Sequence, residues 1–245
     1  MLRKIFPKFG ALGTRKGNIM GNRKNSGGEA AIDITKRYTL GEEIFNSVTH
    51  GVGGLLAIAG TAVLIVLAAI HGGAWEVVSS AIFGFSLILL YTMSTLYHAL
   101  TGKRAKSFFR IMDHDTIFFL IAGTYTPITL VPLRSAVGWV LFGIIWGAAV
   151  LGIVMNSIDL ERFRKPSVVC YALMGWAIVF AIKPMLTNCT PLSLWFLLIG
   201  GLCYTGGMVF YVMKSKKYFH SIWHIFTVSG SVFHYFSVML MMLNG

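Results

Sequence analysis

Residues 220–243 read HSIWHIFTVSGSVFHYFSVMLMML, an apolar run without a single Asp, Glu, Lys or Arg. A helix of this length crosses the ~30 Å hydrocarbon core of a bilayer. Six more runs of similar length precede it, at residues 45–70, 75–100, 111–133, 136–156, 167–186 and 192–213. Because the runs are continuous and do not alternate, they predict helices and not the strands of a membrane barrel. The sequence therefore predicts an all-α membrane protein, a seven-transmembrane helical bundle.

The composition agrees with this fold class. Hydrophobic residues make up 56% of the chain and charged residues only 12%, and the mean hydropathy is +0.71, which is too apolar for a soluble domain. The runs define a predicted seven-helix transmembrane domain at 37–245. Residues 1–36 are rich in Gly, Asn, Lys and Arg, which predicts a disordered basic cytosolic tail. This tail lacks the apolar core of a signal peptide, and Met20 is a second candidate start.

The positive charges are distributed unevenly between the two sides of the predicted bundle. Of 21 Lys and Arg residues, all but Arg134 and Lys183 lie before the first run or in the segments 101–110, 157–166 and 214–219. This asymmetry follows the positive-inside rule and predicts a cytosolic N-terminus and an outside C-terminus. The net charge of +12 is thereby explained without a nucleic-acid partner. A further expectation is that the tail contacts anionic lipid headgroups.

Several polar residues lie at the predicted cytosolic ends of apolar runs. Ser94 and His98 end the second run and, being four residues apart, share one helix face. Asp113 opens the third run, and His220 and His224 open the seventh, again four residues apart. Ionisable groups at membrane depth are costly and by default indicate function. The topology predicts that these helix ends meet at a similar depth.

Three imidazoles and an open fourth position suit a catalytic Zn²⁺ ion. The spacing of His220 and His224 resembles half of a metalloprotease helix, but Ser221 stands where that motif needs a Glu base. A base must therefore come from elsewhere. Asp113 either binds the metal directly or orients a water as the general base. We expect Ser94 to hydrogen-bond to that water or to a substrate oxygen.

Asp115 is an alternative to Asp113. It lies two residues further on, about 200° around a helix, so only one of the two can face a given site. The residues alone do not choose between them. Other ionisable residues near the same level have a structural interpretation, namely His50, His114, and the acids Glu42 and Glu43 at the start of the first run. A helix N-terminus favours acids there without any catalysis.

Five segments together carry a family resemblance: EEIFNSVTHG at 42–51, STLYH at 94–98, FRIMDH at 109–114, GTYTP at 123–127 and FHSIWH at 219–224. They resemble the hemolysin III branch of the progestin and adipoQ receptor (PAQR) family, over about residues 37–245. The resemblance implies a multi-pass protein of a bacterial plasma membrane with a zinc site facing the cytosol. The residues that this implies for the site are Ser94, His98, Asp113, His220 and His224. It thus selects Asp113 over Asp115.

The same resemblance bears on function. The family is distantly similar to alkaline ceramidases, which implies zinc-dependent hydrolysis of a lipid amide or ester at the cytosolic leaflet, with a membrane lipid as substrate or ligand. A pore-forming cytolysin is the alternative implied by the family name, although no run carries a full polar stripe. A third hypothesis is a receptor-like sensor or regulator of membrane lipid state, in which the zinc is structural. The sequence leaves the oligomeric state open.

Overall fold

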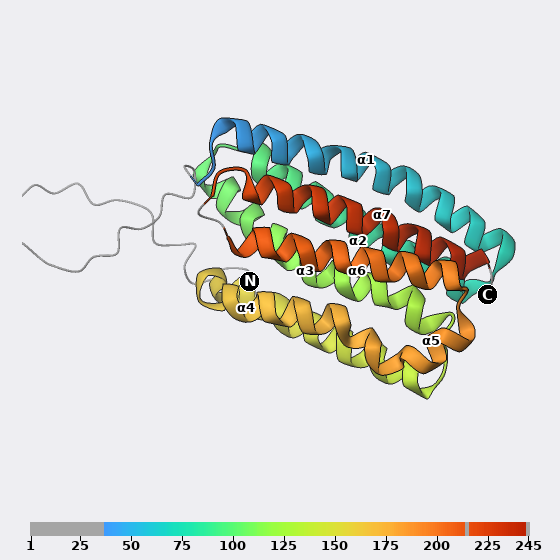
Figure 1. Ribbon diagram of the computed structural model, residues 1–245. Helices are drawn as coiled ribbons and strands as arrows, with labels where there is room; N and C mark the ends of the chain where they lie inside the picture. Colours follow the sequence, from blue (N-terminus) through green and yellow to red (C-terminus); the bar gives the residue numbers. More distant parts are fainter. Residues whose placement is uncertain (1–36, 214–215, 244–245) are drawn as a thin grey trace, which may run out of the picture. The chain divides into compact units, whose positions relative to one another are not determined.

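The computed structural model describes residues 37–213 and 216–243 and is all-helical over these two ranges. The expected disordered tail at residues 1–36 lies outside the described residues. The elements are α1 (Leu40–His71), α2 (Ala74–Ala99), α3 (Lys103–Leu130), α4 (Ala136–Trp176), the 3₁₀ helix η4 (Ala177–Ala181), α5 (Ile182–Asn188), α6 (Pro191–Val212) and α7 (Phe219–Leu243) (Figure 1). The predicted all-α fold class is confirmed.

Helix α4 reverses direction at Asp159. The backbone there has φ −157° and ψ 91°, outside the helical region, and Figure 1 shows the two arms of α4 running back along each other. The Asp159 side chain accepts a 3.2 Å hydrogen bond from the backbone N–H of Arg162, which caps the start of the second arm. The two arms, with η4 and α5, correspond to the runs expected at 136–156 and 167–186.

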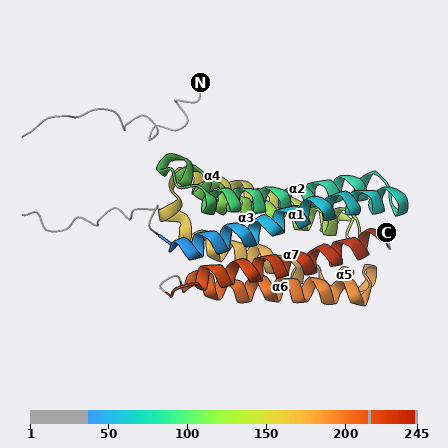
Figure 2. The ribbon, with the colours of Figure 1, turned by 90° about the horizontal axis from the view of Figure 1, so that it is seen from above.

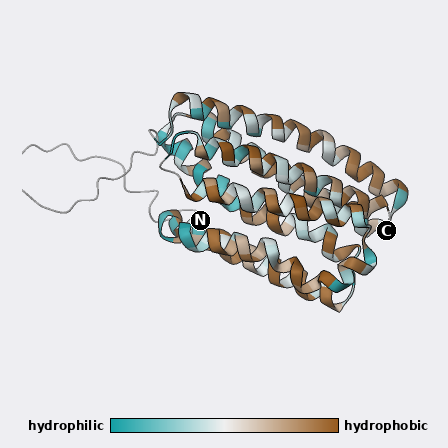
Figure 3. Cartoon of the chain, in the orientation of Figure 1, coloured by the Kyte–Doolittle hydropathy of each residue, from teal (hydrophilic) through white to brown (hydrophobic). Residues whose placement is uncertain are grey.

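Five segments of the described residues are long and apolar enough to cross a membrane. They are Leu40–His71, Ala74–Ala99, Ala136–Asn188, Pro191–Val212 and Phe219–Leu243. Figure 3 shows hydrophilic residues gathered at the helix ends and hydrophobic residues along the middle. The chain is therefore a multi-pass membrane protein.

Helix α3 is absent from that set because it carries Asp113, Asp115 and several threonines within its apolar run. It packs against α2 and against α4, with a smaller contact to α7. Most of its side chains from residue 113 onward are buried. A helix covered by its neighbours does not need an apolar surface toward lipid, which explains how polar residues are tolerated here.

The packing order brings distant segments together. Helix α1 packs on α2 and α7, and α6 packs on the other side of α7, as Figure 2 shows from above. The start of α1, the end of α2 and the starts of α3 and α7 therefore share one end of the bundle (Figure 1). This is the end at which the sequence predicts the functional residues.

Candidate metal centre

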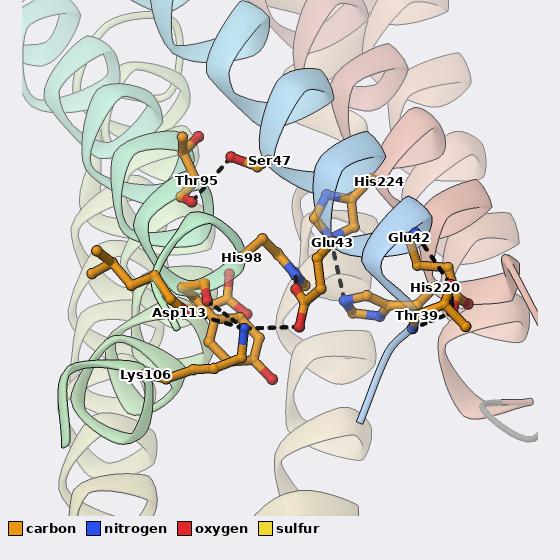
Figure 4. Close-up of polar contacts among 12 residues, drawn as sticks. Thr39, Glu42, Glu43, Ser47, Thr95, His98, Lys106, Asp113, His220 and His224 are labelled. Atoms are coloured by element: carbon orange, nitrogen blue, oxygen red, sulfur yellow. Dashed lines mark hydrogen bonds and ion pairs between the residues drawn. The ribbon is translucent and has the colours of Figure 1, made fainter. Parts of the chain in front are cut away.

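Three of the predicted ligands, His98, His220 and His224, converge at this end. All three are buried, and one ring nitrogen from each lies within 4.8 Å of the other two. The Nε2 atoms of His220 and His224 are 3.2 Å apart (Figure 4). The centroid of the His98 ring lies 5.4 Å from that of His220 and 5.0 Å from that of His224. Helices α2 and α7 thus bring together imidazoles that are more than a hundred residues apart in sequence.

The nitrogen positions fit a metal ion. Two nitrogens bound at about 2.0–2.1 Å to a tetrahedral zinc lie about 3.3 Å from each other, close to the separation found for His220 and His224. In addition, the Nε2 atom of His98 is buried and has no hydrogen-bond partner among the described residues. Buried polar atoms without a partner are rare in proteins. The three residues could therefore hold one metal ion and leave a coordination position open.

The His98 ring is held by a carboxylate that the sequence interpretation had treated as a simple helix-end acid. Its Nδ1 atom lies 2.6 Å from Oε2 of Glu43. The other carboxylate oxygen, Oε1, lies 2.8 Å from Nζ of Lys106. Lys106 is itself buried and donates a 3.1 Å hydrogen bond to the carbonyl oxygen of Tyr97. The chain of contacts joins the first turns of α1 and α3 to the end of α2 (Figure 4).

A polar stripe on α1 forms one wall of the site. Asn46 and His50 are fully buried, and the His50 ring stacks on His224 with centroids 3.7 Å apart. Glu43, Asn46 and His50 recur three and four residues apart, so they share one helix face. This spacing of polar residues within an otherwise apolar run is the sequence pattern that could have identified Glu43 as part of the site. His50 lies against the site without belonging to the group of mutually close ligand atoms.

Aromatic rings hold His220 from two sides. Tyr38 stacks on it with centroids 4.7 Å apart and an interplanar angle of 16°. Trp223 stacks at 5.1 Å and 27°, and the Tyr211 ring follows at 6.3 Å. These contacts restrict the rotation of the imidazole and shield it with apolar surface.

The two candidate aspartates differ in their surroundings. Asp115 points to α4, where its Oδ2 accepts a 3.0 Å hydrogen bond from the Ser157 hydroxyl. Asp113 is also buried, and its Oδ2 lies 3.6 Å from Nδ1 of His114. It does not belong to the group of mutually close ligand atoms formed by the three histidines. Whether Asp113 acts as ligand or base stays a prediction.

The remaining predicted residues also have defined places. Ser94 is fully buried one turn before His98, and its hydroxyl has no hydrogen-bond partner in the part of the chain that the structure describes. His114 binds within its own helix, with Nδ1 2.9 Å from the carbonyl oxygen of Arg110. The structural interpretation of His114 agrees with this contact.

An apolar cavity lies behind the aromatic residues that pack on His220, between α3, the second arm of α4, α6 and α7. One part, of about 120 Å³, is lined by Tyr211 and Trp223, which also contact the ring of His220. A second part, of about 470 Å³, extends toward α5. Both parts share the lining residues Thr124, Tyr125, Gly175, Trp176, Gly201 and His234. The cavity thus ends at two of the aromatic residues that surround His220.

Known proteins similar to this chain agree with the resemblance found in the sequence. The family profile described as "Haemolysin-III related" matches residues 38–235. Hemolysin-3 of Bacillus cereus is 42% identical over 202 residues, which cover 82% of this chain and 92% of that protein. The Hemolysin-3 homolog of Bacillus subtilis is also 42% identical, over 82% of this chain and 95% of its own length. The human monocyte to macrophage differentiation factor is 30% identical over 207 residues, 80% of this chain and 83% of that protein.

Proposed function

Because this chain belongs to the haemolysin-III related family, we propose that it is a zinc-dependent hydrolase of a lipid amide or ester, acting at the cytosolic leaflet. The observation that carries the proposal is a group of three buried imidazoles, one of which, His220, packs against two residues that line an apolar cavity, Tyr211 and Trp223. A site that hydrolyses lipids needs an apolar cavity for the acyl chain and polar groups at one end of that cavity.

We also propose seven membrane passes, with the N-terminus in the cytosol. The segment Ala136–Asn188 folds back at Asp159, so it supplies two passes in place of one. Helix α3 is long enough to add another, since its carboxylates are covered by neighbouring helices. The orientation rests on the excess of Lys and Arg at one end. The three histidines then lie at the cytosolic side of a plasma membrane.

In the proposed reaction His98, His220 and His224 hold the zinc ion. When bound, zinc supplies Lewis acidity, which polarises a carbonyl group and acidifies water. Asp113 accepts the proton of the attacking water and passes it to the leaving nitrogen or oxygen. The new bond joins water oxygen to the carbonyl carbon, and the bond from that carbon to the leaving atom breaks.

The other polar and aromatic residues orient the substrate. The Ser94 hydroxyl, which is buried and lacks a partner among the described residues, donates a hydrogen bond to a substrate oxygen. Tyr211 and Trp223 line the cavity and pack on His220, so they would lie between the acyl chain and the ring of His220. Bound lipid would exclude water from the site, which strengthens the electrostatic interactions there.

Two other functions have specific support. The names of the Bacillus relatives favour a pore-forming cytolysin. The burial of the three histidines, which belong to α2 and α7, favours a lipid sensor in which the metal only joins helices. Both alternatives predict no covalent change in a lipid, whereas a hydrolase releases product.

The full chain, purified in detergent, tests the proposal. We expect about one zinc per chain and release of fluorescent fatty acid from a ceramide-like amide or the corresponding ester. The variant carrying both His220→Ala and His224→Ala should lose zinc and turnover together. Dye leakage from liposomes without product release would support the cytolysin, and zinc binding with neither leakage nor product would support the sensor.

A further inference from the structure

We propose that Glu43 is a positioning residue of the metal centre: its carboxylate fixes the ring of His98 through Nδ1, and Lys106 holds the carboxylate in place. The inference rests on the proposed zinc centre and assigns it a carboxylate–histidine pair on α1. Such pairs set the tautomer and orientation of a ligating imidazole and raise its basicity.

The geometry determines which ring nitrogen of His98 is available. An ionised carboxylate only accepts hydrogen bonds, so Nδ1 of His98 donates to Oε2 of Glu43 across 2.6 Å. The lone pair of the neutral ring is then on Nε2. That atom is buried without a hydrogen-bond partner among the described residues, and His98 belongs to the group of mutually close ligand atoms. By binding Nδ1, Glu43 thus leaves the Nε2 atom of His98 available to bind the metal.

Lys106 explains how the carboxylate of Glu43 is held in place. Only 3% of this residue is exposed, and Nζ lies 2.8 Å from Oε1 of Glu43. The ammonium also donates to the carbonyl oxygens of Tyr97, at 3.1 Å, and Leu100, at 3.4 Å. A buried ammonium is tolerated when it is paired and hydrogen-bonded in this way. These contacts tie Glu43 to the end of α2, one and two residues from His98.

The neighbouring acid shows that Glu43 is not needed to cap α1. Glu42 already forms the capping box, since its side chain accepts a 2.9 Å hydrogen bond from the backbone N–H of Thr39. Glu42 also accepts a 2.8 Å hydrogen bond from the backbone N–H of Tyr218. The macrodipole favours any acid in this turn, but it does not select a side chain that reaches His98. The two successive glutamates therefore have separate roles.

Zinc affinity of the full chain, measured by chelator competition in detergent, tests the assignment. Glu43→Ala should bind zinc roughly 10- to 100-fold more weakly, the usual effect of losing such a partner. Glu43→Gln should lose less, because the amide oxygen still accepts from Nδ1. The matched control is Glu161→Gln, which breaks an ion pair with Arg110 at the same end of the bundle and should keep the wild-type affinity.

A second measurement does not require the metal. In metal-free protein, ¹⁵N spectra of the His98 ring should show the Nδ1–H tautomer in the wild type and in Glu43→Gln. Glu43→Ala should give a mixture of tautomers. If Glu43→Ala fails to accumulate, the isosteric Glu43→Gln decides the question, since a several-fold loss of zinc affinity is expected for it and none for Glu161→Gln.

The outcomes separate this inference from the proposed function. Wild-type zinc affinity in both Glu43 variants would overturn the role of Glu43, whether or not lipid is hydrolysed. Weakened affinity in the ranked order Ala, Gln, wild type, with no lipid product from any of them, would support the role and overturn the hydrolase. Absence of zinc from the wild type would overturn both.

Discussion

The carboxylate of Glu42 accepts a 2.8 Å hydrogen bond from the backbone N–H of Tyr218, so the first turn of α1 fixes the turn that begins α7. His220 follows Tyr218 by two residues. The φ angle of Tyr218 is +63°, a left-handed conformation that costs a non-glycine residue about 1–2 kcal/mol. The contact with Glu42 helps to hold this strained turn and with it the start of the helix that carries two imidazoles.

The turn at Tyr218 gives a prediction about stability. Tyr218→Gly should unfold at a temperature close to that of the wild type, because glycine adopts a positive φ without steric cost. Tyr218→Val should be less stable than Tyr218→Gly by about 1–2 kcal/mol, since a β-branched residue is poorly suited to this region. Thermal unfolding in detergent would measure the difference. Equal melting temperatures for the two variants would contradict the strained turn.

The metal centre gives a second prediction. His220→Ala and His224→Ala should each lose most bound zinc, measured by elemental analysis, and should melt at lower temperature because bound metal stabilises the folded state. His71→Ala is the control: this exposed histidine lies at the opposite end of α1, and its Nδ1 atom is 3.1 Å from the carbonyl oxygen of Leu67. Undiminished zinc in the double variant His220→Ala/His224→Ala would exclude the site.

The two aspartates of α3 allow a matched comparison. Asp113→Asn should retain zinc, because three nitrogens and a solvent ligand complete a tetrahedron. Its turnover of a ceramide-like amide should fall by roughly 10²- to 10⁴-fold, the usual contribution of a general base. Asp115→Asn should lower this turnover much less, since Asp115 faces Ser157 on α4. Equal turnover in the wild type and Asp113→Asn would remove Asp113 as the base.

Two adjacent glycines test the role of the cavity. A Cβ atom at Gly201 meets nothing within 4 Å, and Gly201 lines both parts of the cavity. Gly201→Leu should therefore fold, keep zinc and lose turnover of long-chain substrates while short-chain analogues still react. At Gly200, a Cβ atom would lie 2.1 Å from Cδ2 of His234, so Gly200→Leu should lower the melting temperature. Unchanged long-chain turnover in Gly201→Leu would exclude the cavity as the acyl site.

Membrane orientation is testable with fusions. A reporter active only in the cytosol should work when attached at residue 1 or within 214–219, where positive charges are concentrated. The same reporter should fail after Gly245. Activity of the C-terminal fusion would contradict an odd number of passes. It would also contradict the proposal that the two arms of α4 on either side of Asp159 each cross the membrane.

The convergence of His98, His220 and His224 could be predicted because an imidazole at membrane depth is costly, so its presence at several helix ends indicates a shared purpose. Helical geometry also predicted that Asp113 and Asp115 could not face the same site. The structure supplies the contact with Ser157 that accounts for Asp115. Sequence spacing lacked this information because it says nothing about which neighbouring helix covers a given face.

Glu43 shows why part of the site could not be predicted. Adjacent acids in the first turn of a helix are both favoured by the macrodipole, so composition treats Glu42 and Glu43 alike. Their side chains point about 100° apart around the helix. Only the packing of α1 against α2 and α7 determines that Glu42 caps the helix and that Glu43 contacts His98. The buried Lys106 was likewise counted only as a topology signal, although it is an ion-pair partner within the bundle.

The polar character of α3 has a consequence for how the protein is assembled. A segment that carries two carboxylates is a poor candidate to leave the translocation channel for lipid on its own, because a charged side chain within the hydrocarbon region is costly. In the folded chain α2 and α4 cover this helix. Helix α3 should therefore partition into the bilayer only together with a neighbouring helix such as α2, so that Asp113 enters the membrane already covered by protein.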